Sequence, residues 1–179
     1  MLRRPFLAAA IALLSSAAVP FAALAQDGWP QPGRNIQLIV PAPGGSGTGD
    51  TIARVLAEEL QARLKTTFVV DNKAGANGNI GASAAAQAPG DGYHFLFSWA
   101  GTLAVNKALY KNLPFDAQKD FVPILLVADV PNILVVNNDL PAKDLAEFEK
   151  YAKANPGKLF FGSTGFGSSL HLSCELFMR

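Results

Sequence analysis

The stretch IVPAPGGSGTGDTIAR, Ile39 to Arg54, has the pattern of a strand end, a glycine-rich turn and a helix start. Residues 35–40, which overlap the beginning of this stretch, form a short, nearly continuous apolar run, which is typical of a strand covered on both faces. After it, apolar residues recur at helical spacing through residues 51–64, and Asp50 stands where a side chain caps a helix N-terminus. Many proteins hold an anion with a strand, a glycine loop and a helix in this order.

The residues of this turn argue against the two best-known nucleotide-binding loops. From Gly44 the glycine spacing is that of a P-loop, but Asp50 and Thr51 stand where that loop has Lys followed by Ser or Thr. An aspartate at that position would repel phosphates. The dinucleotide fingerprint fails as well, because its third glycine position falls on Asp50. The turn therefore predicts an anion site built from backbone N–H groups rather than a nucleotide site.

The alternation of strands and helices continues toward the C-terminus. Strands are expected at 67–70 and 93–98, with an alanine-rich helix at 80–88 between them. Together with the first strand and helix, they make two βαβ units. Right-handed crossovers then give a parallel sheet with helices on the outside, which is an α/β fold.

A second group of elements is expected after Thr102. Strands are predicted at 121–127, 133–136 and 158–162, and helices at 142–154 and from residue 170 onward. We therefore expect a first α/β lobe over residues 26–102 and a partial second α/β lobe over residues 103–179.

Four of the predicted parallel strands end in loops of small residues, at 41–49, 72–79, 98–102 and 162–169. Ligands of open α/β sheets bind beyond the carboxyl ends of the strands, where glycine and helix N-termini present N–H groups. Lys73 is the only basic residue in these loops, so we expect neutral donors to capture a carboxylate. In any single loop, tight turns explain the glycines equally well, but four such loops favour a binding edge.

The first 25 residues have the pattern of a secretory signal peptide. Arg3 and Arg4 precede an apolar run, and Ala23-Leu24-Ala25 fits the A-x-A cleavage pattern, so cleavage is expected before Gln26. Twin-arginine export and a membrane anchor stay open as alternatives. We expect a periplasmic protein whose mature chain does not insert stably into the membrane.

The charge and the cysteine content exclude several functional classes. The chain has 15 Lys and Arg against 14 Asp and Glu, which excludes a strongly basic nucleic-acid binder. Cys174 is the only cysteine, so there is no disulfide framework and no cysteine-based metal site. The carboxylates are dispersed along the sequence. We therefore expect neither a metal site nor a cofactor.

Residues suited to catalysis are sparse. His94 lies inside an expected strand, and His171 lies in the first turn of the last expected helix, near Ser168 and Ser169. No G-x-S-x-G elbow precedes these serines, and no acidic partner for His171 is evident. A secreted hydrolase stays open as an alternative, but we expect no enzyme and no catalytic residue.

Several short segments resemble, in their order along the chain, the solute receptors of tripartite tricarboxylate transporters, the Bug-type periplasmic binding proteins. The matching segments are PGG at 43–45 with Asp50, VDNKAGANG at 70–78, DGY at 91–93, KDFVP at 119–123, KANPGK at 153–158 and STG at 163–165 with His171. The resemblance implies a two-lobed, type II-like periplasmic binding protein with parallel sheets and flanking helices. It also implies a small carboxylated solute in the cleft between the lobes and delivery to membrane transporter subunits.

The resemblance further implies which residues hold the solute. Two loops of the first lobe should hold the solute's carboxylate, through Gly44, Gly45, Ser46 and Thr48 and through Ala76, Asn77 and Gly78, and Thr102 should support the carboxylate. The residues that should approach from the second lobe are Ser163, Gly165, Ser168 and His171. Trp99 departs from the small residue expected near the cleft.

Length is the largest departure from the pattern, because receptors of this kind continue well past residue 179. We therefore expect a C-terminally truncated chain with an incomplete second lobe. A truncated remnant without solute binding, regulatory or non-functional, is the alternative function. Which carboxylate is bound, and the oligomeric state, stay open.

Overall fold

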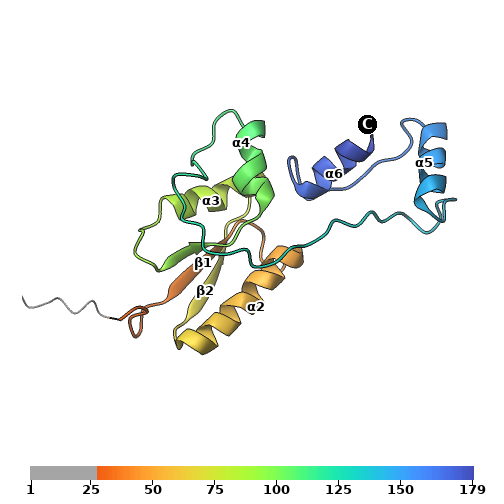
Figure 1. The fold of residues 1–179 in the computed structure, drawn as a ribbon. Helices are drawn as coiled ribbons and strands as arrows, with labels where there is room; N and C mark the ends of the chain where they lie inside the picture. The colour runs from red at the N-terminus through yellow and green to blue at the C-terminus, as the bar shows by residue number, and fades with distance from the viewer. Residues whose placement is uncertain (1–27) are drawn as a thin grey trace, which may run out of the picture. The chain divides into compact units, whose positions relative to one another are not determined.

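A computed structural model describes residues 28–179, and the expected signal peptide at 1–25 lies outside these residues. The chain divides into two units, a short segment up to Arg34 and a larger unit over Asn35–Arg179. The strands and helices that position the candidate site all belong to the larger unit (Figure 1).

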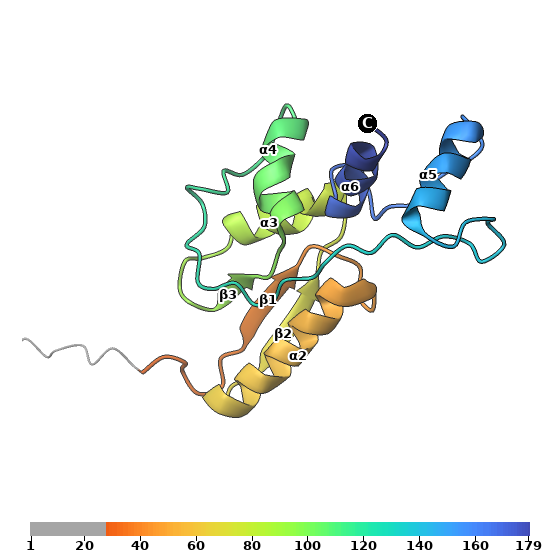
Figure 2. The same cartoon turned by 45° about the vertical axis from the view of Figure 1, so that its right-hand side comes forward.

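A three-stranded parallel sheet is the centre of the expected first lobe (Figure 2). The strands β1 (Ile36–Val40), β2 (Phe68–Asn72) and β3 (His94–Leu96) lie in the order β2-β1-β3. In the register of the sheet, Gln37 of β1 is opposite Val69 on one side and His94 on the other. The central strand is apolar at four of its five positions, as expected for a strand covered on both faces. The two predicted βαβ units are confirmed.

The helices of these units cover opposite faces of the sheet (Figure 1). Helix α2 (Gly47–Leu64) leads from β1 to β2, and α3 (Asn79–Ala86) leads from β2 past β1 to β3. The two crossovers run in opposite directions along the sheet, so right-handed connections place their helices on opposite sides. Leu38 and Val40 pack against Ala53 and Ala57 of α2, whose small side chains let the helix lie close to β1.

Four helical segments follow β3, namely the π-helix η2 (Gly101–Val105), α4 (Asn106–Leu109), α5 (Leu145–Ala154) and α6 (Ser169–Phe177). Helix α5 begins with a reciprocal capping arrangement. Asp144 accepts the Glu147 N–H at 2.9 Å, and the Glu147 carboxylate accepts the Lys143 N–H at 2.7 Å. Within residues 28–179 none of the helices is both long and apolar enough to span a bilayer.

The strands predicted at 121–127, 133–136 and 158–162 are not present in the described residues, so this prediction was wrong. Val122, Leu126 and Val135 are 87%, 85% and 82% exposed. Their composition favours a strand, but a strand forms only where a neighbouring strand supplies hydrogen bonds and a surface to bury. No such neighbour pairs with these segments in residues 28–179. The division into lobes at residues 102 and 103 stays a prediction.

Candidate functional site

The loops that follow β1, β2 and β3 meet at the carboxyl edge of the sheet, because parallel strands all end on the same side. In the first loop, a Cβ atom on Gly49 would lie 3.1 Å from the Trp99 ring, which follows β3. In the second loop, a Cβ on Gly78 would overlap the Thr102 hydroxyl and lie 3.3 Å from Pro41. Residues 162–169, the expected fourth loop, do not follow a strand in this structure but lead into α6.

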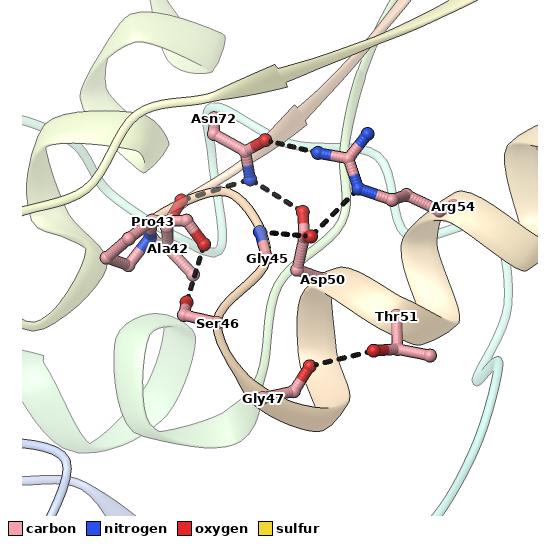
Figure 3. A network of polar contacts seen from close by, with 9 residues as sticks. All are labelled: Ala42, Pro43, Gly45, Ser46, Gly47, Asp50, Thr51, Arg54 and Asn72. Atoms are coloured by element: carbon pink, nitrogen blue, oxygen red, sulfur yellow. Dashed lines mark hydrogen bonds and ion pairs between the residues drawn. The ribbon is translucent and has the colours of Figure 1, made fainter.

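Asp50 is buried behind the first loop and anchors it (Figure 3). Its carboxylate accepts the Gly45 N–H at 2.7 Å, Arg54 Nε at 2.8 Å and Asn72 Nδ2 at 2.8 Å. The Arg54 side chain, followed by Asn72 and the Gly45 N–H, lowers the pKa of Asp50 to about 2. Asp50 is therefore ionised at neutral pH.

The expectation that Asp50 caps α2 from outside was wrong. The helix begins at Gly47, so Asp50 lies in its first turn and Ser46 is the N-cap residue. The Ser46 hydroxyl donates to the Pro43 carbonyl instead of accepting from the helix. No side chain of the described residues therefore caps α2, and its first-turn N–H groups stay open at the positive end of the helix dipole.

All four residues predicted in the first loop, Gly44, Gly45, Ser46 and Thr48, are exposed. The Gly45 N–H is already taken by Asp50, so it is not available to a solute. A Cβ on Gly44 would lie 3.1 Å from Asn72 Oδ1, which explains a glycine at this position by packing. The open donors of the loop are therefore those at the beginning of α2.

The second loop forms a 3-10 turn, η1 (Ala76–Gly78), which leads into α3. Asn77 and Gly78 have left-handed backbone conformations, with φ of 51° and 87°. The Thr102 hydroxyl is buried and donates to the Asn77 carbonyl at 3.0 Å. Thr102 therefore supports this loop, and its hydroxyl proton is taken by the Asn77 carbonyl rather than open to a solute, while Gly78 is needed for close packing against Thr102.

Asn106 is a second buried anchor, which the sequence analysis did not identify. Its Nδ2 donates to the Asn77 carbonyl at 3.0 Å and to Asn79 Oδ1 at 2.6 Å. Its Oδ1 accepts Asn77 Nδ2 at 2.8 Å. An asparagine that is 0% exposed and fully hydrogen-bonded fixes the second loop, but its burial comes from tertiary packing that no local pattern shows.

The turn before α6 contributes one close contact and one helix cap. A Cβ on Gly167 would lie 3.2 Å from Asn77 Nδ2, so this turn reaches the second loop. The buried Ser168 hydroxyl accepts the His171 N–H at 3.2 Å and caps α6. Ser163 is exposed, and the Gly165 N–H donates to its hydroxyl at 3.4 Å. Within the described residues, the hydrogen bonds of Ser163 and Gly165 stay in their own turn.

The His171 ring has an acidic neighbour, contrary to the expectation from the sequence. Nε2 lies 3.6 Å from Glu175 Oε1, one helical turn further on, and Nδ1 accepts the Gly167 N–H at 3.4 Å. The Ser168 hydroxyl contacts the backbone N–H of His171. This is the geometry of a helix cap, and not of a serine activated by a histidine base.

The remaining charged groups near the loops are already paired. Lys73 Nζ lies 3.0 Å from Asp71 Oδ2, and Arg54 binds both Asp50 and Asn72. Over residues 28–179 no three His, Cys, Asp or Glu side chains gather in a way that could hold a metal ion. The edge therefore presents mainly neutral N–H and hydroxyl donors, which suit a small anion.

Residues 52–179 match the family described as the tripartite tricarboxylate transporter family receptor. The chain belongs to this receptor family. Protein BugT of Bordetella pertussis is 44% identical over 147 residues, which cover 82% of this chain and 45% of BugT. The family is one of receptors and not of enzymes.

Two solved structures from Rhodopseudomonas palustris are also similar to this receptor-family chain. One, a protein with adipate, is 39% identical, with a TM-score of 0.78, and the match covers 84% of this chain and 49% of that one. The other, MatC with bound malate, is 33% identical, with a TM-score of 0.73 and coverage of 82% and 49%. The predicted α/β periplasmic binding-protein fold class is confirmed. The chain spans about half the length of the curated relatives it matches.

Proposed function

We propose that this chain is the solute-capturing part of a periplasmic receptor. It binds a small carboxylated solute at the carboxyl edge of the sheet and presents it to the membrane subunits of a tripartite tricarboxylate-type transporter. The observation that carries the proposal is the uncapped beginning of α2, which Asp50 holds beside the second and third loops. The relatives with adipate and malate support a carboxylate as the ligand.

The proposed contacts divide between groups that touch the solute and groups that hold the loops. The N–H groups at Gly47, Thr48 and Gly49 and the Thr48 hydroxyl bind one carboxylate, helped by the partial positive charge of the helix N-terminus. Ala76 and Asn77 offer backbone groups from the second loop. Gly44, Gly45, Ser46, Gly78 and Thr102 shape these two loops, as their contacts with Asp50, Asn72, Pro43, Pro41 and Asn77 support.

Ser163, Gly165, Ser168 and His171 form the proposed contribution of the second lobe. Ser163 is exposed and the His171 side chain is partly exposed, whereas Ser168 acts by capping α6. In a two-lobed receptor these groups approach the solute when the lobes close. The loops contain no unpaired cation among the described residues, which favours a solute with one or two carboxylates over a tricarboxylate.

The proposed location is the periplasm, reached through the N-terminal signal peptide, and we propose no catalytic activity. The contact between the Ser168 hydroxyl and a backbone N–H supports the absence of a serine nucleophile. Ester or amide turnover that disappears in His171→Ala would contradict this part of the proposal.

Calorimetric titration with adipate tests the proposed function, with adipamide as the neutral control of the same length. The chain is measured alone and joined to the portion of BugT that it does not span. We expect the joined protein to bind adipate and not adipamide, because the helix N-terminus selects for negative charge. No adipate binding by the joined protein, or equal binding of adipamide, would contradict the proposal.

A further inference from the structure

The network behind the first loop links three pieces of backbone (Figure 3). Asp50 Oδ2 accepts from the Gly45 N–H and from Arg54 Nε, and Asp50 Oδ1 accepts from Asn72 Nδ2. Asn72 Oδ1 in turn accepts Arg54 Nη2 at 2.9 Å, and its Nδ2 also donates to the Ala42 carbonyl at 3.1 Å. The first loop, at Ala42 and Gly45, the first turn of α2 and the end of β2 are therefore joined by one set of side chains.

The network uses the inner side of the loop and leaves the outer side open. The Asp50 side chain is 2% exposed, whereas Ser46, Gly47 and Thr48 are exposed. A buried anion beside a binding site for anions would repel the solute if it stood alone. Arg54 lies 2.8 Å from the Asp50 carboxylate and balances its charge, so the repulsion is reduced.

We propose that Asp50 and Asn72 are positioning residues that fix the first loop in its binding conformation before a solute arrives. This inference rests on the proposed function and assigns these residues no contact with the solute. The loop contains Gly44, Gly45, Gly47 and Gly49, and without an anchor such a chain loses much conformational freedom when it binds a ligand. An anchor that orders the loop beforehand removes this cost from the binding step.

The hydrogen-bond pattern allows a swap experiment. In Asp50→Asn, the new NH₂ group would face the NH₂ group of Asn72, so one contact between positions 50 and 72 is lost. In the double variant Asp50→Asn with Asn72→Asp, the amide at position 50 donates to the carboxylate at position 72, which can also accept from Arg54. The double variant therefore restores the contact between positions 50 and 72 with the charge in the other place. A carboxylate at position 72 cannot donate to the Ala42 carbonyl, so the anchor is restored only in part. Ala57→Gly is the control, because it weakens α2 without touching the network.

Amide hydrogen exchange of the full chain without solute is the first readout. We expect the Gly45 amide to exchange about tenfold faster in Asp50→Asn and to return part of the way to the wild-type rate in the double variant. Ala57→Gly should instead raise exchange along α2 and leave the exchange rate of the Gly45 amide unchanged. Unchanged Gly45 exchange in Asp50→Asn, or no recovery in the double variant, would overturn the proposal.

Adipate titration followed by NMR is the second readout, and it separates this inference from the proposed function. The titration uses the chain joined to the portion of BugT that it does not span. If the wild-type joined protein binds adipate, Asp50→Asn should weaken binding about tenfold and the double variant should restore part of the affinity. Equal affinity in all variants would overturn the positioning role. If the wild-type joined protein does not bind adipate, the proposed function fails, and the exchange rates alone decide whether Asp50 and Asn72 order the loop.

Discussion

At the scale of single residues, the glycines at the binding edge have two different physical roles. Gly45 and Gly47 have φ of 71° and 70° with open space around them, so the shape of the loop requires their left-handed conformation. At Gly81 of α3, in contrast, a Cβ would lie 2.8 Å from Pro41 Cβ and 2.9 Å from the Lys73 carbonyl. The sequence alone does not distinguish a glycine required by its backbone conformation from one required by close packing, whereas the contacts in the structure do.

Gly81→Ala is expected to lower the free energy of unfolding by about 1–3 kcal/mol, because the added methyl group meets two backbone segments. Alanine normally stabilises a helix by about 1 kcal/mol relative to glycine, so the expected sign is opposite to the helix propensity. Gly90→Ala is the control, since a Cβ there meets open space, and it should change stability by less than about 0.5 kcal/mol. Urea unfolding measures both variants. A Gly81→Ala variant as stable as the wild type would contradict the close packing of α3.

Asp50 gives a prediction for acid pH. Its pKa in the folded chain, about 2, lies below the ordinary value of 3.8, so the ionised form stabilises the fold. This contribution is complete above the ordinary pKa and is lost as the pH falls through the folded pKa. The stability difference between the wild type and Asp50→Asn should therefore be constant near neutral pH and shrink between about pH 4 and pH 2.

Urea unfolding at several pH values checks this, and taking the difference between the two proteins cancels other titrating groups. Asp116 is one of these, because the Gln118 N–H lowers its pKa as well. A difference that stays the same down to the lowest pH would show that the Asp50 carboxylate is not held in its charged form.

At the scale of elements, the sequence predicted the strands and helices that can be recognised from the spacing of apolar residues within a single segment. The apolar run before the first loop, the helical spacing after it and the alanine-rich helix all correspond to observed elements, with boundaries shifted by at most four residues. The segments 121–127 and 133–136 have equally good strand composition but no partner strand in the described residues. Asn72 and Asn106 were missed as anchors of the site because their burial and partners come from distant parts of the chain.

The cap of α6 provides a prediction at this scale. Ser168→Ala removes the acceptor of the His171 N–H, which costs about 1 kcal/mol of helix stability. A helix of 9 residues is marginal without its cap and its packing, so the amides of α6 should exchange faster. Ser169→Ala is the control, because that hydroxyl donates to Asn132 Oδ1 and does not cap the helix. Equal exchange rates of α6 in both variants would contradict the role of Ser168 as the cap.

At the scale of the whole molecule, residues 122–136, which pair with no strand in the described residues, determine how we expect the chain to associate in solution. Large apolar side chains are exposed along residues 122–136, among them Val122, Leu126, Ile133 and Val135 at 87%, 85%, 74% and 82%. Exposed apolar side chains, on backbone whose N–H and C=O groups have no partner strand, favour association with other chains. We therefore predict that residues 26–179 self-associate and bind carboxylates weakly or not at all on their own.

Analytical ultracentrifugation tests the self-association. The double substitution Leu126→Lys with Val135→Lys should shift the isolated chain toward the monomer, because charge opposes pairing of exposed strand-like segments. Val55→Lys is the control, since Val55 is 58% exposed on α2, outside these segments, and it should leave the distribution unchanged. A monodisperse wild-type monomer would refute this expectation.

The most direct test of the central claim, that the open beginning of α2 holds a carboxylate, is an NMR titration with adipate of the chain joined to the portion of BugT that it does not span. Chemical shifts detect even weak binding, so the measurement does not depend on high affinity. The claim predicts saturable shifts of the Gly47, Thr48 and Gly49 amides with adipate and none with adipamide, because the helix N-terminus binds negative charge. Shifts that avoid these amides, or that are equal for adipate and adipamide, would contradict it.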